Sequence, residues 1–258
     1  MRHALFLLLA LALASSPANA GPLSPRCATD PALLVPDEPA QHFLDALKPG
    51  HVVNILAIGS ATTAGDAKSD HATFPDYLMA ALHQAVPGTV FHLTLRGGRG
   101  MTAEDMLPLL QGALANRPTP LVLWQTGTVE AVRGMRPADM QDALADGIQA
   151  VAAQGGDVVL IDPQFSRFLR ANVDLVPYED VLTEAAALPE VSLFPRFTLM
   201  RDWAENGRID LERTPRRTRL AALETLNACL GQALAHFVLS GSPEEAAISQ
   251  DLPTIPPR

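Results

Sequence analysis

The chain has 258 residues, a formal net charge of −9 and a pI near 5.2. An acidic chain of this kind is not expected to bind nucleic acid, because phosphate contacts need clustered Lys and Arg. A basic cluster between Arg213 and Arg219 is predicted to be a solvated loop. The seven histidines and two cysteines show no spacing typical of a metal site, so we predict neither a metal nor another cofactor.

Residues 1–20 have the three parts of a secretory signal. Met1-Arg2-His3 is a short basic region, an apolar run extends from Ala4 to Ala14, and Ala18-Asn19-Ala20 is a small-residue cleavage sequence. The apolar run is shorter than the ~20 residues that span a bilayer, which disfavours a membrane anchor. We expect cleavage after Ala20, a periplasmic or secreted mature protein, and no membrane span after cleavage.

A Pro-rich lead-in over residues 21–50 precedes the main domain, with a short helix expected at Gln41–Leu47. Cys27 lies in this lead-in and Cys229 in a late helical stretch. In an oxidising compartment such a pair usually forms a disulfide, which here would close a very long loop. The alternative is a free Cys27 and a buried, reduced Cys229.

Short apolar runs alternate with stretches of helical period between residues 51 and 239. The predicted strands are Val53–Ile58, Val90–Leu95, Leu121–Gln125, Asp157–Ile161 and Val191–Phe194, and the predicted helices are Phe74–Ala85, Ala103–Ala115, Pro137–Ala153, Tyr178–Ala187 and Leu220–Leu239. Such alternation predicts one three-layer α/β/α domain around a mostly parallel five-stranded sheet. Residues 240–258 have little apolar content and are predicted to be disordered.

In a sheet of this class the active site lies at the carboxyl ends of the strands. Four loops follow predicted strands: Gly59–Gly65, Arg96–Thr102, Thr126–Glu130 and Asp162–Phe165. Each loop is a weak signal by itself. In this order and at these separations they resemble the SGNH, or GDSL-like, hydrolase family over roughly residues 50 to 238.

The resemblance implies a flavodoxin-like α/β/α fold and, in an intact member, ester hydrolysis. Such members carry a serine in the first block, an oxyanion glycine, an asparagine in the third block, and an Asp and a His before the last helix. Aligned on the flanking residues, Ala61 takes the serine position and Val129 the asparagine position, and Gly100 keeps the glycine. Thr218 and Ala221 take the positions of the acid and the base. We predict that the catalytic residues are lost, and loss of a triad nucleophile alone typically costs ~10⁶ in kcat.

Polar residues and glycines still surround the vacant serine position. The candidate cleft residues are Ser60, Thr62, Gly100, Gln125, Thr128, Glu130 and Asp162. A displaced Ser60 nucleophile assisted by Glu130 or Asp162 is one interpretation. The favoured one is that Ser60 and Thr62 cap the following turn or helix.

Three functional hypotheses follow. The leading one is an exported, catalytically inactive SGNH-like protein that binds a glycan or an acyl-ester-bearing polymer of the cell envelope. The second is an active esterase or deacetylase that uses displaced residues such as Ser60. The third is an envelope scaffold or assembly subunit that binds a protein partner through an outer surface.

Overall fold

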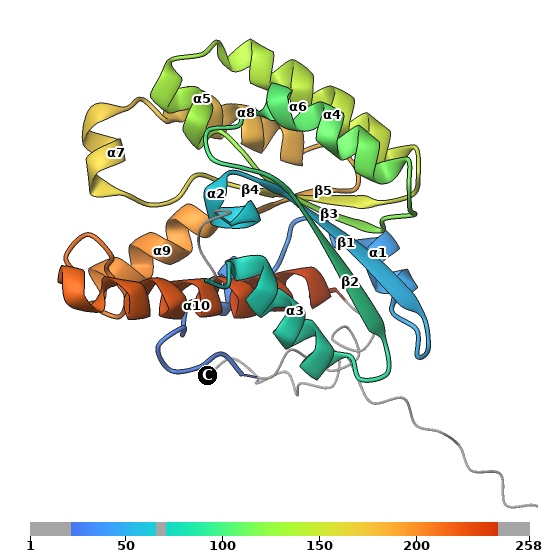
Figure 1. Cartoon of the computed structure of the whole chain (residues 1–258), viewed down its shortest axis with the longest axis horizontal. Coiled ribbons are helices and arrows are strands. Elements are labelled where there is room, and N and C mark those ends of the chain that lie inside the picture. Colours follow the sequence, from blue (N-terminus) through green and yellow to red (C-terminus); the bar gives the residue numbers. More distant parts are fainter. Residues whose placement is uncertain (1–21, 66–70, 242–258) are drawn as a thin grey trace, which may run out of the picture.

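Five strands form one sheet at the centre of the computed structural model, which describes residues 22–65 and 71–241. They are β1 Val52–Gly59, β2 Val90–Gly97, β3 Leu121–Gln125, β4 Asp157–Ile161 and β5 Val191–Phe194, in the order β2-β1-β3-β4-β5. Every neighbouring pair is parallel (Figure 1). The predicted three-layer α/β architecture is therefore confirmed, with a sheet that is parallel throughout rather than mostly so.

The strand sequences explain the order of the sheet. β3 and β4 are buried at every position, as expected of central parallel strands that are covered on both faces. β1 and β2 stay in register from Val52 opposite Val90 to Gly59 opposite Gly97. Gly97 has a φ of 106°, and a Cβ there would lie 2.0 Å from the Gly59 carbonyl oxygen. Glycine at the end of β2 therefore permits the close approach of the two strands beside the predicted site.

Helices cover both faces of the sheet (Figure 1). One face carries α4 Ala103–Leu114, α5 Thr128–Arg133, α6 Pro137–Ala152 and α8 Val176–Ala186, and the other carries α1 Gln41–Ala46, α3 Phe74–Ala85, α9 Arg196–Glu205 and α10 Arg219–Leu239. The shorter elements are the helices α2 Ala61–Ala64 and α7 Arg167–Asn172 and the 3₁₀ turns η1 Pro31–Leu34 and η2 Arg216–Thr218. No helix in the described ranges is long and apolar enough to span a membrane.

The disulfide between Cys27 and Cys229 is present, so this prediction is confirmed. Its two Cα atoms lie 5.0 Å apart although 202 residues separate them in sequence. One residue further along the lead-in, the carbonyl oxygen of Ala28 accepts hydrogen bonds from the Trp203 indole and the Arg208 guanidinium. The lead-in is thus fixed to α10 by a covalent bond and to the end of α9 by hydrogen bonds.

The long elements agree with their predicted bounds to within two residues, and the bounds of β3, β4, β5 and α3 match them. The sequence pattern did not predict α2, α5, α7, α9 or either 3₁₀ turn. Most of these have six residues or fewer, too few turns for a hydrophobic period to develop. The predicted signal at residues 1–20 and nearly all of the predicted tail lie outside the described residues.

Candidate functional site

Ala61, the residue aligned with the serine of SGNH hydrolases, lies at the carboxyl end of β1, where that strand turns into α2. Ser60 has extended backbone angles and is the N-cap residue, and Ala61 is the first residue of α2. The Ser60 side chain makes no capping hydrogen bond. Its hydroxyl oxygen instead accepts a hydrogen bond from Gln125 Nε2 at 3.2 Å. Ser60 is therefore the N-cap residue of α2, as predicted, but its hydroxyl and that of Thr62 bond Gln125 on a neighbouring strand rather than the backbone of the first turn.

The side chain of Gln125, at the end of β3, forms hydrogen bonds with the hydroxyl groups of three residues in this turn. It is only 3% exposed, and its Oε1 accepts hydrogen bonds from Thr62 Oγ1 at 2.8 Å and Thr63 Oγ1 at 2.6 Å. Its Nε2 donates to Ser60. One buried amide thus holds the hydroxyls on both sides of Ala61. Such satisfied, buried networks fix local geometry, because an unmade bond in a low-dielectric interior is costly. The same network ties α2 to the central strand β3.

Glu130 in α5 is a second buried hub, only 1% exposed. Its Oε1 accepts hydrogen bonds from the Ala103 backbone nitrogen and Thr126 Oγ1, both at 2.6 Å. Its Oε2 accepts one from the Gly127 backbone nitrogen at 2.9 Å. The carboxylate therefore joins the N-terminus of α4 to the β3–α5 turn. This is the geometry of a structural anion, since both oxygens already have donors.

Replacing Glu130 with Gln is expected to lower the free energy of unfolding by about 1–3 kcal/mol, because an amide group then faces a backbone N–H donor within the buried cluster. Urea unfolding of the variant beside wild type would measure the loss. Glu104→Gln, an exposed position at the start of α4, is the matched control. Equal midpoints for Glu130→Gln and wild type would contradict the structural role assigned to this carboxylate.

Gly100 and Val129, the positions aligned with the family's oxyanion glycine and asparagine, lie at the same edge of the sheet as Ala61. Gly100 has a φ of 78°, and Arg133 Nη2 would be 3.1 Å from a Cβ placed there, so this guanidinium lies beside the glycine. Val129 is the second residue of α5 and presents no polar group. Thr128 before it has a buried hydroxyl without a hydrogen-bond partner. Gly100 thus has the left-handed backbone that suits a glycine, and Val129, aligned with the family's asparagine, has no side-chain donor.

Asp162 follows β4 and belongs to a different polar cluster. Its Oδ1 accepts a hydrogen bond from the Phe197 backbone nitrogen at 2.7 Å. Burial raises the pKa of this carboxyl to about 7, and the Phe197 hydrogen bond and the positive charge of Arg196 act against that rise. Since β3 lies between β1 and β4, the strand ends that carry Ser60 and Asp162 are about 10 Å apart. The structure therefore does not bring these two residues together.

Arg196, at the start of α9, is the cation of this cluster and is 3% exposed. Burial lowers the pKa of its guanidinium to about 10. Nη2 donates to Gln164 Oε1 at 3.3 Å, and the guanidinium carbon lies 5.8 Å from the centre of the Phe74 ring. Nε and Nη1 have no hydrogen-bond partner. The sequence analysis did not predict this buried position, because the helix that starts at Arg196 was not recognised.

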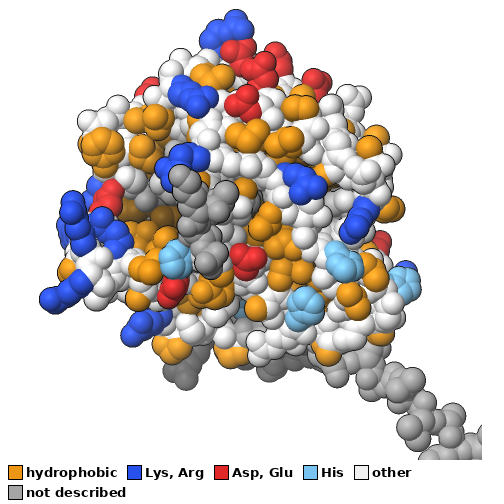
Figure 2. All heavy atoms as spheres, in the orientation of Figure 1, with side chains coloured by type: hydrophobic (Ala, Val, Ile, Leu, Met, Phe, Trp, Pro, Cys, Tyr) orange, Lys and Arg blue, Asp and Glu red, His pale blue; other side chains and the backbone are white. Residues whose placement is uncertain are grey.

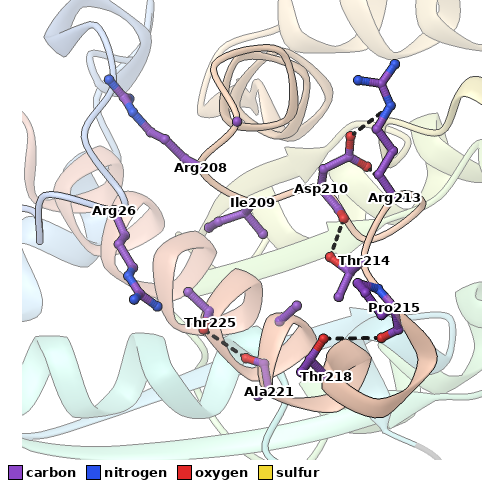
Figure 3. Close-up of a pocket in the computed structure, with 12 residues that line it drawn as sticks. Arg26, Arg208, Ile209, Asp210, Arg213, Thr214, Pro215, Thr218, Ala221 and Thr225 are labelled. Carbon is purple, nitrogen blue, oxygen red and sulfur yellow. Dashed lines mark hydrogen bonds and ion pairs between the residues drawn. The ribbon is translucent and has the colours of Figure 1, made fainter.

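Thr218 and Ala221, the positions aligned with the family's acid and base, lie where η2 leads into α10. Both are exposed and line a pocket of about 400 Å³ (Figure 3). Neither Ala61 nor Val129 belongs to the lining of this pocket. The four aligned positions thus fall into two places: the strand edge around Ala61, and the pocket at the start of α10.

A histidine–carboxylate pair lies beside the first turns of α10. His71 Nδ1 is 3.8 Å from Glu224 Oε1, and both side chains are about half exposed. Glu224 is one helical turn beyond Ala221. Nothing in the sequence indicated this pair, because the two residues are more than 150 positions apart. Within the described segments, no group of three or more His, Cys, Asp or Glu side chains is arranged to hold a metal ion.

Comparison with known protein families shows to which family the chain belongs. Residues 26–244 match the model of the Non-GDSL lipase-like family. The chain belongs to this family. No curated protein matches its sequence.

Solved structures with the same fold include several esterases. TesA is 24% identical with a TM-score of 0.55, over 70% of this chain and 97% of its own. The SGNH-hydrolase family esterase AlinE4 is 19% identical with a TM-score of 0.52, over 80% of this chain and 100% of its own. A mutant of Axe2, an acetyl-xylooligosaccharide esterase from Geobacillus, is 13% identical with a TM-score of 0.55, over 73% of this chain and 96% of its own. The SGNH resemblance seen in the loops is thus confirmed for the fold of this Non-GDSL lipase-like protein.

Proposed function

We propose that this member of the Non-GDSL lipase-like family is an exported, catalytically inactive protein that binds a glycan or an acyl-ester-bearing polymer of the cell envelope. The observation that carries the proposal is that the polar side chains near Ala61 are engaged in hydrogen bonds within the protein. Ser60 and Glu130 are held by other contacts, and the strand that precedes Asp162 ends too far away. The secretory signal predicted at residues 1–20 and the disulfide support export, because structural disulfides persist in oxidising compartments.

The nucleophile is the first missing group. Ala61 has a methyl group at the start of α2, and the nearest hydroxyl in sequence, Ser60, accepts a hydrogen bond from Gln125. An activated serine needs a base that accepts its proton. The amide group that contacts Ser60 is a donor and does not perform that task.

The base is the second missing group. Both oxygens of Glu130 are occupied by donors from α4 and the β3–α5 turn. Asp162 has a pKa of about 7, in the range suited to a general base. Its strand ends about 10 Å from that of Ser60, however, whereas proton transfer needs a separation of about 3 Å. Neither carboxyl therefore activates Ser60 directly.

A glycan or acyl-ester ligand is supported by the fold that the chain has kept. The strand edge retains Gly100 in its left-handed conformation. A protein of the same fold, Axe2, is named for an acetylated xylo-oligosaccharide. A fold that binds an acyl-bearing saccharide in one protein offers the same framework for binding in a chain without the serine, since binding and chemistry use separable groups.

One observation favours the second hypothesis, an active esterase or deacetylase. His71 and Glu224 form a histidine–carboxylate pair near the start of α10, where the family has its own acid and base. If His71 took the proton of Ser60, the chain would be an enzyme with displaced catalytic residues. This alternative makes a clear demand: hydrolysis must depend on both side chains.

The deciding experiment measures ester hydrolysis by the protein starting at Gly21, with p-nitrophenyl acetate and an acetylated xylo-oligosaccharide as substrates. Ser60→Ala, His71→Ala and Ala61→Ser are assayed beside wild type. We expect no turnover above the buffer rate in any of the four proteins, together with calorimetric binding of the oligosaccharide to wild type.

Turnover by wild type that disappears in Ser60→Ala or His71→Ala would overturn the proposal in favour of the esterase. Absence of both turnover and binding in a folded sample would overturn the glycan part of the proposal and leave the scaffold hypothesis. Circular dichroism of each sample verifies folding.

A further inference from the structure

We infer that the pocket at the start of α10 binds the carboxylate of an acidic saccharide, and that Arg26 is the residue that pairs with it. The inference rests on the proposed function, because it names the ligand class for a glycan-binding protein. It also assigns the binding to a specific pocket, the one lined by Thr218 and Ala221, which are aligned with the acid and base of intact SGNH hydrolases.

The pocket is built from three separate parts of the chain (Figure 3). Arg26 comes from the lead-in, one wall comes from the segment between Gly207 and Thr218, and the floor comes from the first turns of α10. The volume of about 400 Å³ falls within the range of small-molecule sites. Figure 3 shows the Arg26 guanidinium turned towards Thr225 on α10, and the Arg208 side chain extending away from the pocket.

Arg26 has the chemistry of a ligand-binding group. It makes no hydrogen bond or ion pair with any part of the chain that the structure describes, and it is exposed. Its planar guanidinium offers a fork of N–H donors that matches the two oxygens of a carboxylate. An unpaired arginine in a pocket is therefore suited to an anionic group, and it needs no rearrangement of an existing ion pair to bind one.

The position of Arg26 is fixed by its neighbours. Cys27 is bonded to Cys229 on α10, and the Ala28 carbonyl oxygen accepts hydrogen bonds from the side chains of Trp203 and Arg208. Two consecutive residues after Arg26 are thus anchored to two different helices. A donor on an anchored backbone loses less entropy on binding than one on a free strand, which favours affinity.

The surroundings carry positive charge although the whole chain has a net charge of −9. Five arginines lie between residues 208 and 219, namely Arg208, Arg213, Arg216, Arg217 and Arg219, against the two acids Asp210 and Glu212. Asp210 is paired with two arginines, because its Oδ2 lies 3.0 Å from Arg167 Nη1 and 3.8 Å from Arg213 Nε, and Arg208 Nη1 lies 3.7 Å from Asp202 Oδ2. Figure 2 shows Lys and Arg side chains gathered at this edge of the molecule. Within the basic cluster that was predicted to be a solvated loop, Arg213 lines the pocket, and Arg216, Arg217 and Arg219 lie close to it in sequence without lining it.

The hydroxyl groups of the pocket suit a sugar. Thr214, Thr218 and Thr225 each donate their hydroxyl hydrogen to a backbone carbonyl, as the dashed lines in Figure 3 show. Their oxygen atoms keep lone pairs that accept hydrogen bonds from ligand hydroxyls. A ligand with many hydroxyl groups and one carboxylate fits this combination better than a simple hydrocarbon acid does.

The test uses trigalacturonate and its fully methyl-esterified form, which keeps the sugar rings and removes the charges. Isothermal titration is performed with oxidised protein starting at Gly21, with Arg26→Gln, and with Arg117→Gln as the control. Arg117 is an exposed arginine between α4 and β3, and it does not line the pocket. We expect trigalacturonate to bind wild type and Arg117→Gln alike, and Arg26→Gln to raise the Kd about tenfold or more, as for loss of a charge-assisted bond. Added salt should weaken binding to wild type.

Equal affinity for the acid and its methyl ester, an unchanged Kd in Arg26→Gln, or no binding of trigalacturonate would each overturn the inference. The proposed function is still supported after any of these results if wild type binds the acetylated xylo-oligosaccharide without hydrolysing it. Conversely, ester turnover that depends on Ser60 would remove the proposed function while leaving the affinity of Arg26 for the acid measurable. The two failures are therefore distinguishable.

Discussion

Reduction of the Cys27–Cys229 disulfide is expected to lower the free energy of unfolding by about 4–5 kcal/mol, as estimated from the loop entropy that the bond removes from the unfolded chain. The closed loop is almost as long as the described chain, with a sequence separation of 202 residues. Cys27 is 2% exposed and Cys229, within α10, is 0% exposed. We therefore expect both side chains to stay packed in the native state after reduction. The effect should therefore arise mainly in the unfolded ensemble.

Urea unfolding of oxidised protein and of protein reduced with a phosphine measures this loss. A Cys27→Ala/Cys229→Ala double variant is the matched control, because it removes the bond without adding a buried polar group. The reduced protein and the double variant should unfold at similar urea concentrations, both well below the oxidised protein. A difference under about 1 kcal/mol would show that the unfolded chain is already compact, and that the entropic account does not apply here.

The disulfide also illustrates what the sequence could establish about this fold. Two cysteines and a predicted secretory signal favoured a single disulfide over two reduced thiols, and the structure contains that bond. The strands were equally predictable, because β3 and β4 are short runs of mostly apolar residues bounded by polar ones. Long helices and strands bury many apolar side chains at regular spacing, and that spacing can be recognised in the sequence alone.

The site was predictable only in part, because its contacts join residues that are far apart in sequence. The loops around Ala61 and Gly100 were located by their glycines and by the strands before them. That Gln125 would hold Ser60, and that Glu130 would bind the N-terminus of α4, depends on the pairing of strands and helices in space. The sequence marked Glu130 as a cleft candidate, whereas burial and three donors give it a structural role.

A second large effect is expected at Asp162, whose replacement by Asn should stabilise the protein above pH 7. Burial raises the pKa of this carboxyl from 3.8 to about 7 in the folded protein. Between these two values the folded state binds a proton that the unfolded state has released. The free energy of unfolding of wild type therefore falls as the pH rises from about 4 to about 7, and stays low above that.

The Asn side chain removes the titration but keeps an oxygen that accepts the hydrogen bond from the Phe197 backbone nitrogen. A shift of about three pKa units corresponds to about 4 kcal/mol. Asp162 retains some exposure, so solvent screening reduces the expected gain at pH 8 to roughly 2–3 kcal/mol. Below about pH 4 the two proteins should show the same pH dependence, because Asp162 is then protonated in both states of wild type.

Urea unfolding at intervals between pH 4 and pH 9 measures the difference between variant and wild type. The readout is the slope with pH, so a constant offset from the substitution itself does not affect it. Asp157→Asn is the matched control: that carboxyl accepts a hydrogen bond from the Phe43 backbone nitrogen, and burial raises its pKa to about 6. Its gain should therefore level off about one pH unit earlier than that of Asp162→Asn. Parallel pH profiles for wild type and Asp162→Asn would show that the Arg196 charge holds Asp162 ionised in the folded protein, so that the guanidinium outweighs burial at this strand end.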